Sequence, residues 1–213
     1  MLFFVLILNE ERVAVIMKMA FVLFDGVTIM DFVGFYDAIT RYARLDASAS
    51  LSWELCATKA EIADDRGMSI RIGRAARDLS GYDALFVPGG MATRQLRFDD
   101  GFMAWLKTGE RAPYKLSVCS GALLLGAAGW LQGKRATTNP SVYDLLPPYG
   151  AETVQARIVR DGGVLTAGGV AASIDLGLYF VESLSDADMA RSVQRQMDYP
   201  YYRAGELSDV YRA

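Results

Sequence analysis

A single cysteine inside a run of small residues is the most reactive group that the sequence offers. Cys119 follows a short apolar run and precedes a segment rich in Gly, Ala and Leu, in the sequence KLSVCSGALLLGAAG. Ser120 and Gly121 come directly after it. Small neighbours are typical of a nucleophile elbow, a tight strand-to-helix turn in which bulky side chains would clash. The segment therefore predicts that Cys119 is a nucleophile at the start of a helix.

The absence of histidine from the sequence limits how Cys119 can work. A cysteine–histidine pair cannot form, so the acid or base beside the thiol must be another residue, and a carboxylate is the best remaining candidate. We expect the positive end of the helix dipole to favour the thiolate form of Cys119. Cys56 lies in a strand pattern instead, and we expect it to pack in the core.

The length allows one large domain, or at most two small ones, and the composition argues against several classes of partner. The chain has 213 residues, of which 52% are hydrophobic and 22% are charged. Its net charge is -3 and no run of Lys or Arg occurs, which argues against a nucleic-acid or anionic-lipid surface. Two cysteines without a CxxC pair, and no histidine, predict neither a disulfide framework nor a metal site. Reduced thiols fit a cytoplasmic protein.

The first seventeen residues are expected to lie outside the domain proper, which we place at residues 18–213. They begin with MLFFVLIL, which is too short to span a bilayer and lacks the basic start and cleavage site of a signal peptide. Two interpretations remain: an extra edge strand or arm, or translated sequence upstream of a true start at Met17. The second is preferred.

Strand and helix patterns alternate along the rest of the chain, which predicts a single α/β domain with a parallel sheet sandwiched by helices. Ligands bind beyond the carboxyl ends of the strands in such sheets, so the loops 25–31, 88–92 and 119–121 are expected to converge on a site. A small hairpin is expected near residues 64–72, and a second one joins the last two strands. We expect strands at 19–24, 52–58, 84–87, 116–118, 154–160 and 164–167, and helices at 29–42, 100–107, 141–146, 171–184 and 187–196.

These patterns resemble the ThiJ/PfpI superfamily, which has a class I glutamine-amidotransferase-like fold. The motifs that carry the resemblance are VPGG at 87–90, SVCSG at 117–121, KRATTNP at 134–140 and LTAGGVAASIDLGL at 165–178. The segments LFDGVTIMDFVGFYDAI and VCSGALLLGAAGWLQGKRATT are most similar to the isonitrile hydratase branch. The resemblance implies a flavodoxin-like, glutamine-amidotransferase-like domain with a nucleophile elbow. It also implies a homodimer and no cofactor.

The resemblance further implies which residues form the site. It pairs the cysteine nucleophile Cys119 with a carboxylate from the first loop, which is Asp31 here, and with the hydroxyl residue Ser120. Glycines at 89 and 90 let the backbone approach closely, and the N–H groups of Gly90 and Ser120 are expected to stabilise negative charge. Where many relatives carry a histidine after two threonines, this chain has Asn139. That difference argues against a protease or glyoxalase.

Most of these residues also allow a structural interpretation. Asp31 is a suitable N-cap for the helix that follows the first strand. Gly89 and Gly90 can form a simple turn, Ser120 can contribute only its backbone, and Asn139 can fill the space of the missing histidine. Two further polar residues are expected to cap the helix after Gly169: Ser173 and Asp175.

The combined interpretation is an enzyme that hydrates isonitriles, or related small-molecule electrophiles, to N-substituted formamides. The Cys119 thiolate would attack the terminal carbon while Asp31 protonates it, and water would then attack the thioimidate. Three alternatives remain: a ligand or redox sensor with an oxidisable Cys119, a glyoxalase or deglycase, and the sensory part of an AraC-type regulator. The regulator is disfavoured because too few residues follow the last predicted helix for a helix-turn-helix module.

Overall fold

The structure is a computed structural model that describes residues 16–46, 49–73, 75, 77–206 and 210–212. The alternatives for residues 1–15 therefore lie outside the described residues. Ile16 and Met17 belong to the first strand, which begins two positions before the boundary expected at residue 18.

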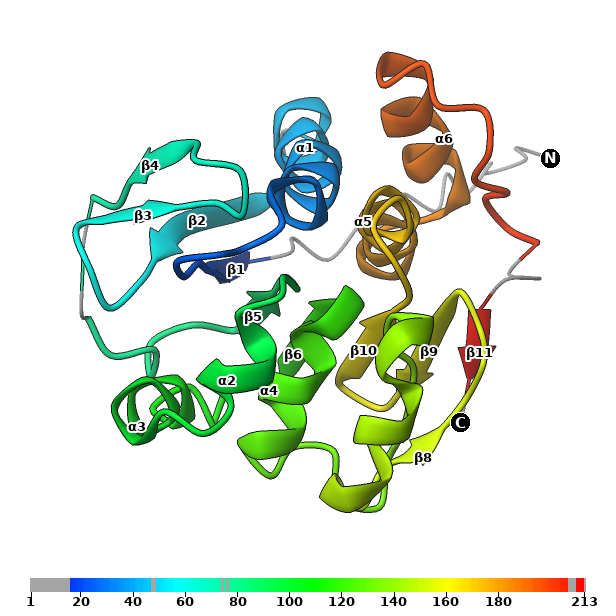
Figure 1. Cartoon of the computed structure of the whole chain (residues 1–213). Coiled ribbons are helices and arrows are strands. Elements are labelled where there is room, and N and C mark those ends of the chain that lie inside the picture. The colour runs from blue at the N-terminus through cyan, green and yellow to red at the C-terminus, as the bar shows by residue number, and fades with distance from the viewer. Residues whose placement is uncertain (1–15, 47–48, 74, 76, 207–209, 213) are drawn as a thin grey trace, which may run out of the picture.

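A seven-stranded sheet forms the centre of the molecule (Figure 1). Its strand order is β11-β9-β10-β6-β5-β1-β2, and all neighbouring strands are parallel except β9 and β10. Parallel strands buried on both faces are typically apolar throughout, and β5, ALFV, is buried at every position. The strands are β1 (Ile16–Val22), β2 (Ser50–Cys56), β5 (Ala84–Val87), β6 (Tyr114–Val118), β9 (Ile158–Asp161), β10 (Val164–Ala167) and β11 (Val210–Arg212).

Helices cover both faces of the sheet, as expected for this class of fold. Figure 1 shows α1, α5 and α6 on one side and α2, α3 and α4 on the other. On the first side, the rings of Phe35 and Phe86 stack with their centroids 4.2 Å apart, which fixes α1 against β5. The helices are α1 (Ile29–Leu45), α2 (Thr93–Leu96), α3 (Asp100–Lys107), α4 (Ala122–Ala127), α5 (Ala172–Leu184) and α6 (Ala187–Gln196).

The order in which strands are added to the sheet changes direction between β1 and β5, and the candidate site lies at this point. The connection from β1 leads outward to β2, whereas the connection from β5 leads to β6 on the other side. Crevices form at such switch points beyond the carboxyl ends of the strands. The loops after β1, β5 and β6 all begin there.

Short elements complete the fold and include the main differences from expectation. The hairpin expected near residues 64–72 is present, and so is the antiparallel pair of β9 and β10. Near the end of the chain, β11 extends the sheet edge beside β9. No helix in the described part of the chain is long and apolar enough to cross a membrane. The short elements are β3 (Glu61–Ala63), β4 (Ser69–Arg71), β7 (Arg135–Ala136), β8 (Glu152–Thr153) and the 3-10 helices η1 (Cys119–Gly121), η2 (Pro140–Leu145) and η3 (Pro147–Tyr149).

Candidate active site

Cys119 lies at a tight turn between β6 and the helical segment that follows. Its φ angle is 55°, a left-handed conformation that is unfavourable for a residue with a side chain and is typical of a nucleophile elbow. The backbone is held on both sides of the turn. Cys119 N–H donates to Gly168 O (2.7 Å), and Thr138 Oγ1 donates to Cys119 O (2.7 Å). The elbow predicted from the small residues around Cys119 is therefore present.

Asp31 lies in the first turn of α1 and is fully buried. The N-cap of this helix is Thr28, so Asp31 does not have the capping role that the sequence also allowed. Its Oδ2 accepts a hydrogen bond from Gly89 N–H (3.1 Å), and its carboxyl group lies beside the Cys119 thiol, so that each group shifts the pKa of the other. Its Oδ1 is buried without a hydrogen-bond partner among the described residues. The structure thus brings together the thiol and the carboxyl group that the sequence analysis paired.

The Cys119–Asp31 pair has unusual proton affinities. Burial raises the pKa of Asp31 to about 7, although the hydrogen bonds from Cys119 and Gly89 act in the opposite direction. Burial and the neighbouring Asp31 carboxylate raise the pKa of the Cys119 thiol to about 11, which outweighs hydrogen bonds from Ser120 and Asn139. The expected lowering of the thiol pKa by the helix dipole is therefore outweighed. At a pH between these two pKa values, the Cys119–Asp31 pair therefore holds one proton.

Gly89 and Gly90 pass directly beside this pair. A Cβ atom at Gly89 would lie 2.8 Å from Cys119 Cβ and 2.9 Å from Asp31 Oδ2, so only glycine fits without moving these groups. Gly90 N–H donates to Ser120 Oγ (3.1 Å), and the Ser120 hydroxyl is 3.0 Å from Gly90 O. The Gly90 N–H is therefore already bonded, which differs from its expected role as a donor to substrate. The N–H of Ser120 instead lies beside Cys119, where it acts to lower the pKa of the thiol.

A small cleft leads from the surface to the cysteine. Its volume is about 120 Å³, and it is lined by Cys119, Ser120, Gly90 and Asn139 among others. Cys119 keeps 9% of its surface exposed and lines this cleft. The Asn139 side chain lies beside Cys119, where it acts to lower the pKa of the thiol, and its Oδ1 accepts from Ser141 N–H (3.0 Å). Asn139 is therefore in contact with the thiol rather than only filling space.

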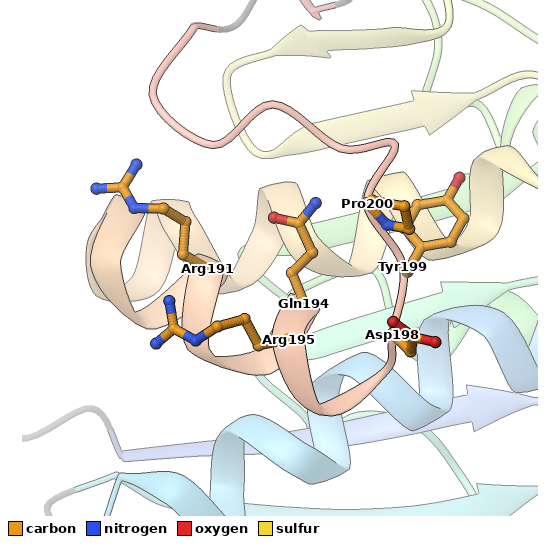
Figure 2. A pocket seen from close by; sticks show the side chains of 6 residues that line it. All are labelled: Arg191, Gln194, Arg195, Asp198, Tyr199 and Pro200. Carbon is orange, nitrogen blue, oxygen red and sulfur yellow. The ribbon is translucent and has the colours of Figure 1, made fainter.

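A second, larger hollow of about 400 Å³ lies beside α6, away from the cysteine. Figure 2 shows Arg191, Gln194 and Arg195 extending from the helix, with Tyr199 and Pro200 on the segment that follows. Arg191 donates to Asp188 and to Ala204 O, so its charge is partly satisfied within the protein. None of the predicted site residues lines this hollow, and it contains no nucleophile comparable to Cys119.

Several residues that organise the site were not identified from the sequence. Ser173 was expected to cap α5, but it joins two helices: its Oγ donates to Asp31 O (2.6 Å) and accepts from Phe35 N–H (2.8 Å). Thr93 Oγ1 lies 2.8 Å from both Gly90 O and Ser120 Oγ. The contacts of Ser173 and the contact between Thr93 and Ser120 join residues distant in the sequence, and no local pattern signals them. Asp175, the other expected cap, is instead ion-paired with Arg157.

Comparison with known proteins identifies the family. The model of the DJ-1/PfpI family matches residues 17–183. The chain belongs to this family. Its members include an isonitrile hydratase from Pseudomonas putida, to which the chain is 36% identical over 184 residues, 86% of this chain and 78% of the relative.

Two further DJ-1/PfpI relatives place the chain within this diverse family. The crystal structure of a ThiJ/PfpI family protein from Pseudomonas syringae superimposes with a TM-score of 0.78 and 32% identity, covering 91% of this chain and 81% of that chain. A deglycase from Pyrococcus abyssi is 35% identical over 83 residues, only 38% of this chain and 49% of the relative. The likeness to the hydratase therefore extends over much more of the chain.

No group of three or more His, Cys, Asp or Glu suited to a metal ion occurs among the described residues.

Proposed function

We propose that this protein is a cysteine-dependent hydratase that converts isonitriles to N-substituted formamides, with Cys119 as nucleophile and Asp31 as general acid and base. The observation that carries the proposal is the Asp31 carboxyl group beside the Cys119 thiol, at an elbow next to a small cleft. The likeness to the Pseudomonas putida isonitrile hydratase over most of the chain supports the same reaction class.

The first step requires a proton and a nucleophile at the same carbon, and the pair supplies both. As the Cys119 sulfur bonds to the terminal carbon of R–N≡C, its proton passes to Asp31 and from there to that carbon. The product of this step is a thioimidate, R–N=CH–S–Cys119. A carboxyl group whose pKa is about 7 accepts and returns a proton with little energetic cost near neutral pH.

The second step uses the same carboxylate to activate water. Water adds to the thioimidate carbon while Asp31 removes one of its protons and passes it to the nitrogen. Asp31 then takes the proton of the new hydroxyl group as the C–S bond breaks and the formamide R–NH–CHO leaves, and this proton returns to the sulfur. One water is consumed and the pair regains its starting state. The N–H of Ser120, which lies beside the sulfur, is placed to stabilise developing negative charge there.

The rival functions have less support from the geometry. A redox sensor needs a reactive thiolate, whereas burial raises the pKa of Cys119 to about 11. A glyoxalase or deglycase activity is favoured by relatives that match less than half of the chain. The position where many members carry a histidine is occupied by Asn139, whose neutral amide offers no base.

The proposal includes a homodimer in the cytoplasm that needs no metal or cofactor. Both cysteines of the chain are free thiols buried in the fold, which fits a reducing compartment. The proposed chemistry is complete with a thiol, a carboxyl group and water, so no further group is required.

We expect the purified protein to convert cyclohexyl isocyanide to N-cyclohexylformamide and to leave glyoxal unconsumed. Both reactions can be followed in parallel on one preparation, by chromatography of the formamide and by loss of glyoxal. Consumption of glyoxal without formamide production would overturn the assignment in favour of the deglycase class.

A further inference from the structure

Arg94 is a cation on the wall of the cleft that leads to Cys119. It lies on α2 and is half-buried, and its side chain has only neutral partners: Nη1 contacts Met91 Sδ (3.2 Å) and Nη2 donates to Ser141 Oγ (3.3 Å). Within the described residues, no carboxylate forms an ion pair with Arg94. The two long contacts leave most of its five N–H donors available.

None of the other described residues that line the cleft carries a charged side chain, apart from the Cys119 thiol when it is ionised. Thr28, Asn139 and Ser141 contribute neutral polar groups, and Met91 contributes an apolar side chain. A guanidinium that is half-removed from water gains most from an anion, because charge-assisted hydrogen bonds are about twice as strong as neutral ones. Its planar fork fits a carboxylate with two parallel hydrogen bonds.

We propose that Arg94 binds a carboxylate on the substrate, so that the preferred substrates are small isonitriles that carry a carboxylate group. This inference rests on the proposed hydratase function. The reaction would then convert ⁻OOC–R–N≡C and one water to ⁻OOC–R–NH–CHO, an N-formyl amino acid or a similar compound. The cleft volume of about 120 Å³ favours a compact R group. Arg94 acts on specificity and takes no part in proton transfer.

Arg97 provides a matched control one turn further along the chain. It is also half-buried and carries the same charge, but it does not line the cleft. Its guanidinium lies 4.6 Å from the ring centroid of Phe98 and donates to Tyr149 OH (3.3 Å). Replacing Arg94 or Arg97 by Gln therefore changes the net charge equally, and only the first change removes a cation from the cleft.

The first measurement does not depend on hydration. Alkylation of Cys119 by iodoacetate and by iodoacetamide is followed by peptide mass spectrometry, and the ratio of the two rate constants reports the preference for an anion. We expect Arg94→Gln to lower this ratio about tenfold, Arg94→Lys to retain part of it, and Arg97→Gln to leave it unchanged. The iodoacetamide rate checks that the cleft remains intact in each variant.

The second measurement compares isocyanoacetate with its methyl ester as substrates. We expect Arg94→Gln to lower kcat/KM for the acid about tenfold relative to the ester, chiefly through KM. Equal ratios in wild type and Arg94→Gln in both measurements would overturn the anion site while leaving the hydratase proposal intact. An alkylation ratio that follows Arg94, in a protein that hydrates no isonitrile, would overturn the hydratase proposal and retain the anion site. A change of oligomeric state in Arg94→Gln alone would assign the arginine to a subunit contact and overturn the inference.

Discussion

Asp31→Asn is expected to lower the turnover of cyclohexyl isocyanide by about a thousandfold, within the range typical for loss of a general acid–base group. The amide can still accept the hydrogen bond from Gly89 N–H, but it cannot exchange a proton with Cys119. In the wild type, kcat/KM should rise with pH through about 7, because below this value the pair carries a second proton and the carboxyl group cannot accept one from the thiol. This rise should be absent from the residual activity of the variant.

The same substitution is expected to stabilise the fold at neutral pH. The unfolded carboxyl group loses its proton near pH 3.8, whereas folded Asp31 keeps it up to about 7, so the free energy of unfolding falls as pH rises through this window. The difference amounts to about 4 kcal/mol above pH 7. In the variant, the buried amide has an unpaired N–H, which costs about 1–3 kcal/mol and offsets part of this gain in stability. Urea unfolding should therefore show Asp31→Asn to be more stable than wild type by about 1–3 kcal/mol at pH 8. At pH 3 or below the order should reverse, and the variant should be less stable than wild type by about 1–3 kcal/mol.

Asp37→Asn is the matched control on the same helix. Asp37 is paired with Arg41 on the exposed side of α1 (2.8 Å), and such a pair contributes less than about 1 kcal/mol. Activity should remain unchanged, and the pH dependence of stability should remain that of the wild type. An Asp31→Asn variant that retained full turnover, or a loss of activity shared equally by Asp37→Asn, would contradict the assigned role of Asp31.

Gly121→Ala is expected to destabilise the fold by at least about 3 kcal/mol, the upper range for overpacking a rigid site. A Cβ atom at Gly121 would overlap Val87 O and lie 2.7 Å from Pro88 O. Both atoms belong to the backbone at the carboxyl end of β5, so no side-chain rotation can relieve the contact. Either the elbow or the strand end must move, and the thiol would be displaced from Asp31. Urea unfolding and the iodoacetamide reactivity of Cys119 would both report this change.

Gly101→Ala tests whether the effect of Gly121→Ala arises from the contact rather than from losing a glycine. Gly101 lies in α3, where a Cβ atom would meet only Asp99 Oδ1 at 3.4 Å. A helical glycine replaced by alanine without a clash usually gains about 0.4–1 kcal/mol. The two substitutions should therefore differ in sign. A similar small effect at both positions would contradict the close approach of β5 to the elbow.

Local patterns in the sequence predicted those parts of the fold and site that depend on neighbouring residues. The run of small residues around Cys119 predicted the elbow, and the alternation of buried strands with helical spacing predicted the α/β class. The bounds of α3 and α6 and of β5 agree with expectation because their ends carry clear breaking or capping residues, such as Asp99 and Asp186, whose side chains accept N-terminal hydrogen bonds. The pairing of Asp31 with Cys119 came from a family resemblance.

Contacts between distant segments could not be predicted in this way. Ser173 lies far along the chain from Asp31, and only folding brings α5 against α1. The position of β11 depends on an open edge at β9, which has no sequence signal in the tail itself. The thiol pKa was wrongly expected to fall because a helix start is visible in the sequence, whereas the burial of the thiol, the largest cause of its raised pKa, is not.

The central claim is that the Cys119 sulfur forms a bond to the isonitrile carbon, and acid-quenched single turnover tests it most directly. Enzyme in excess over cyclohexyl isocyanide would be quenched at successive times and analysed by intact and peptide mass spectrometry. We predict an adduct of one isocyanide on the Cys119 peptide that forms and decays as the formamide appears, with neither adduct nor formamide in Cys119→Ala. Formamide production by Cys119→Ala at the rate of the wild type would contradict the mechanism.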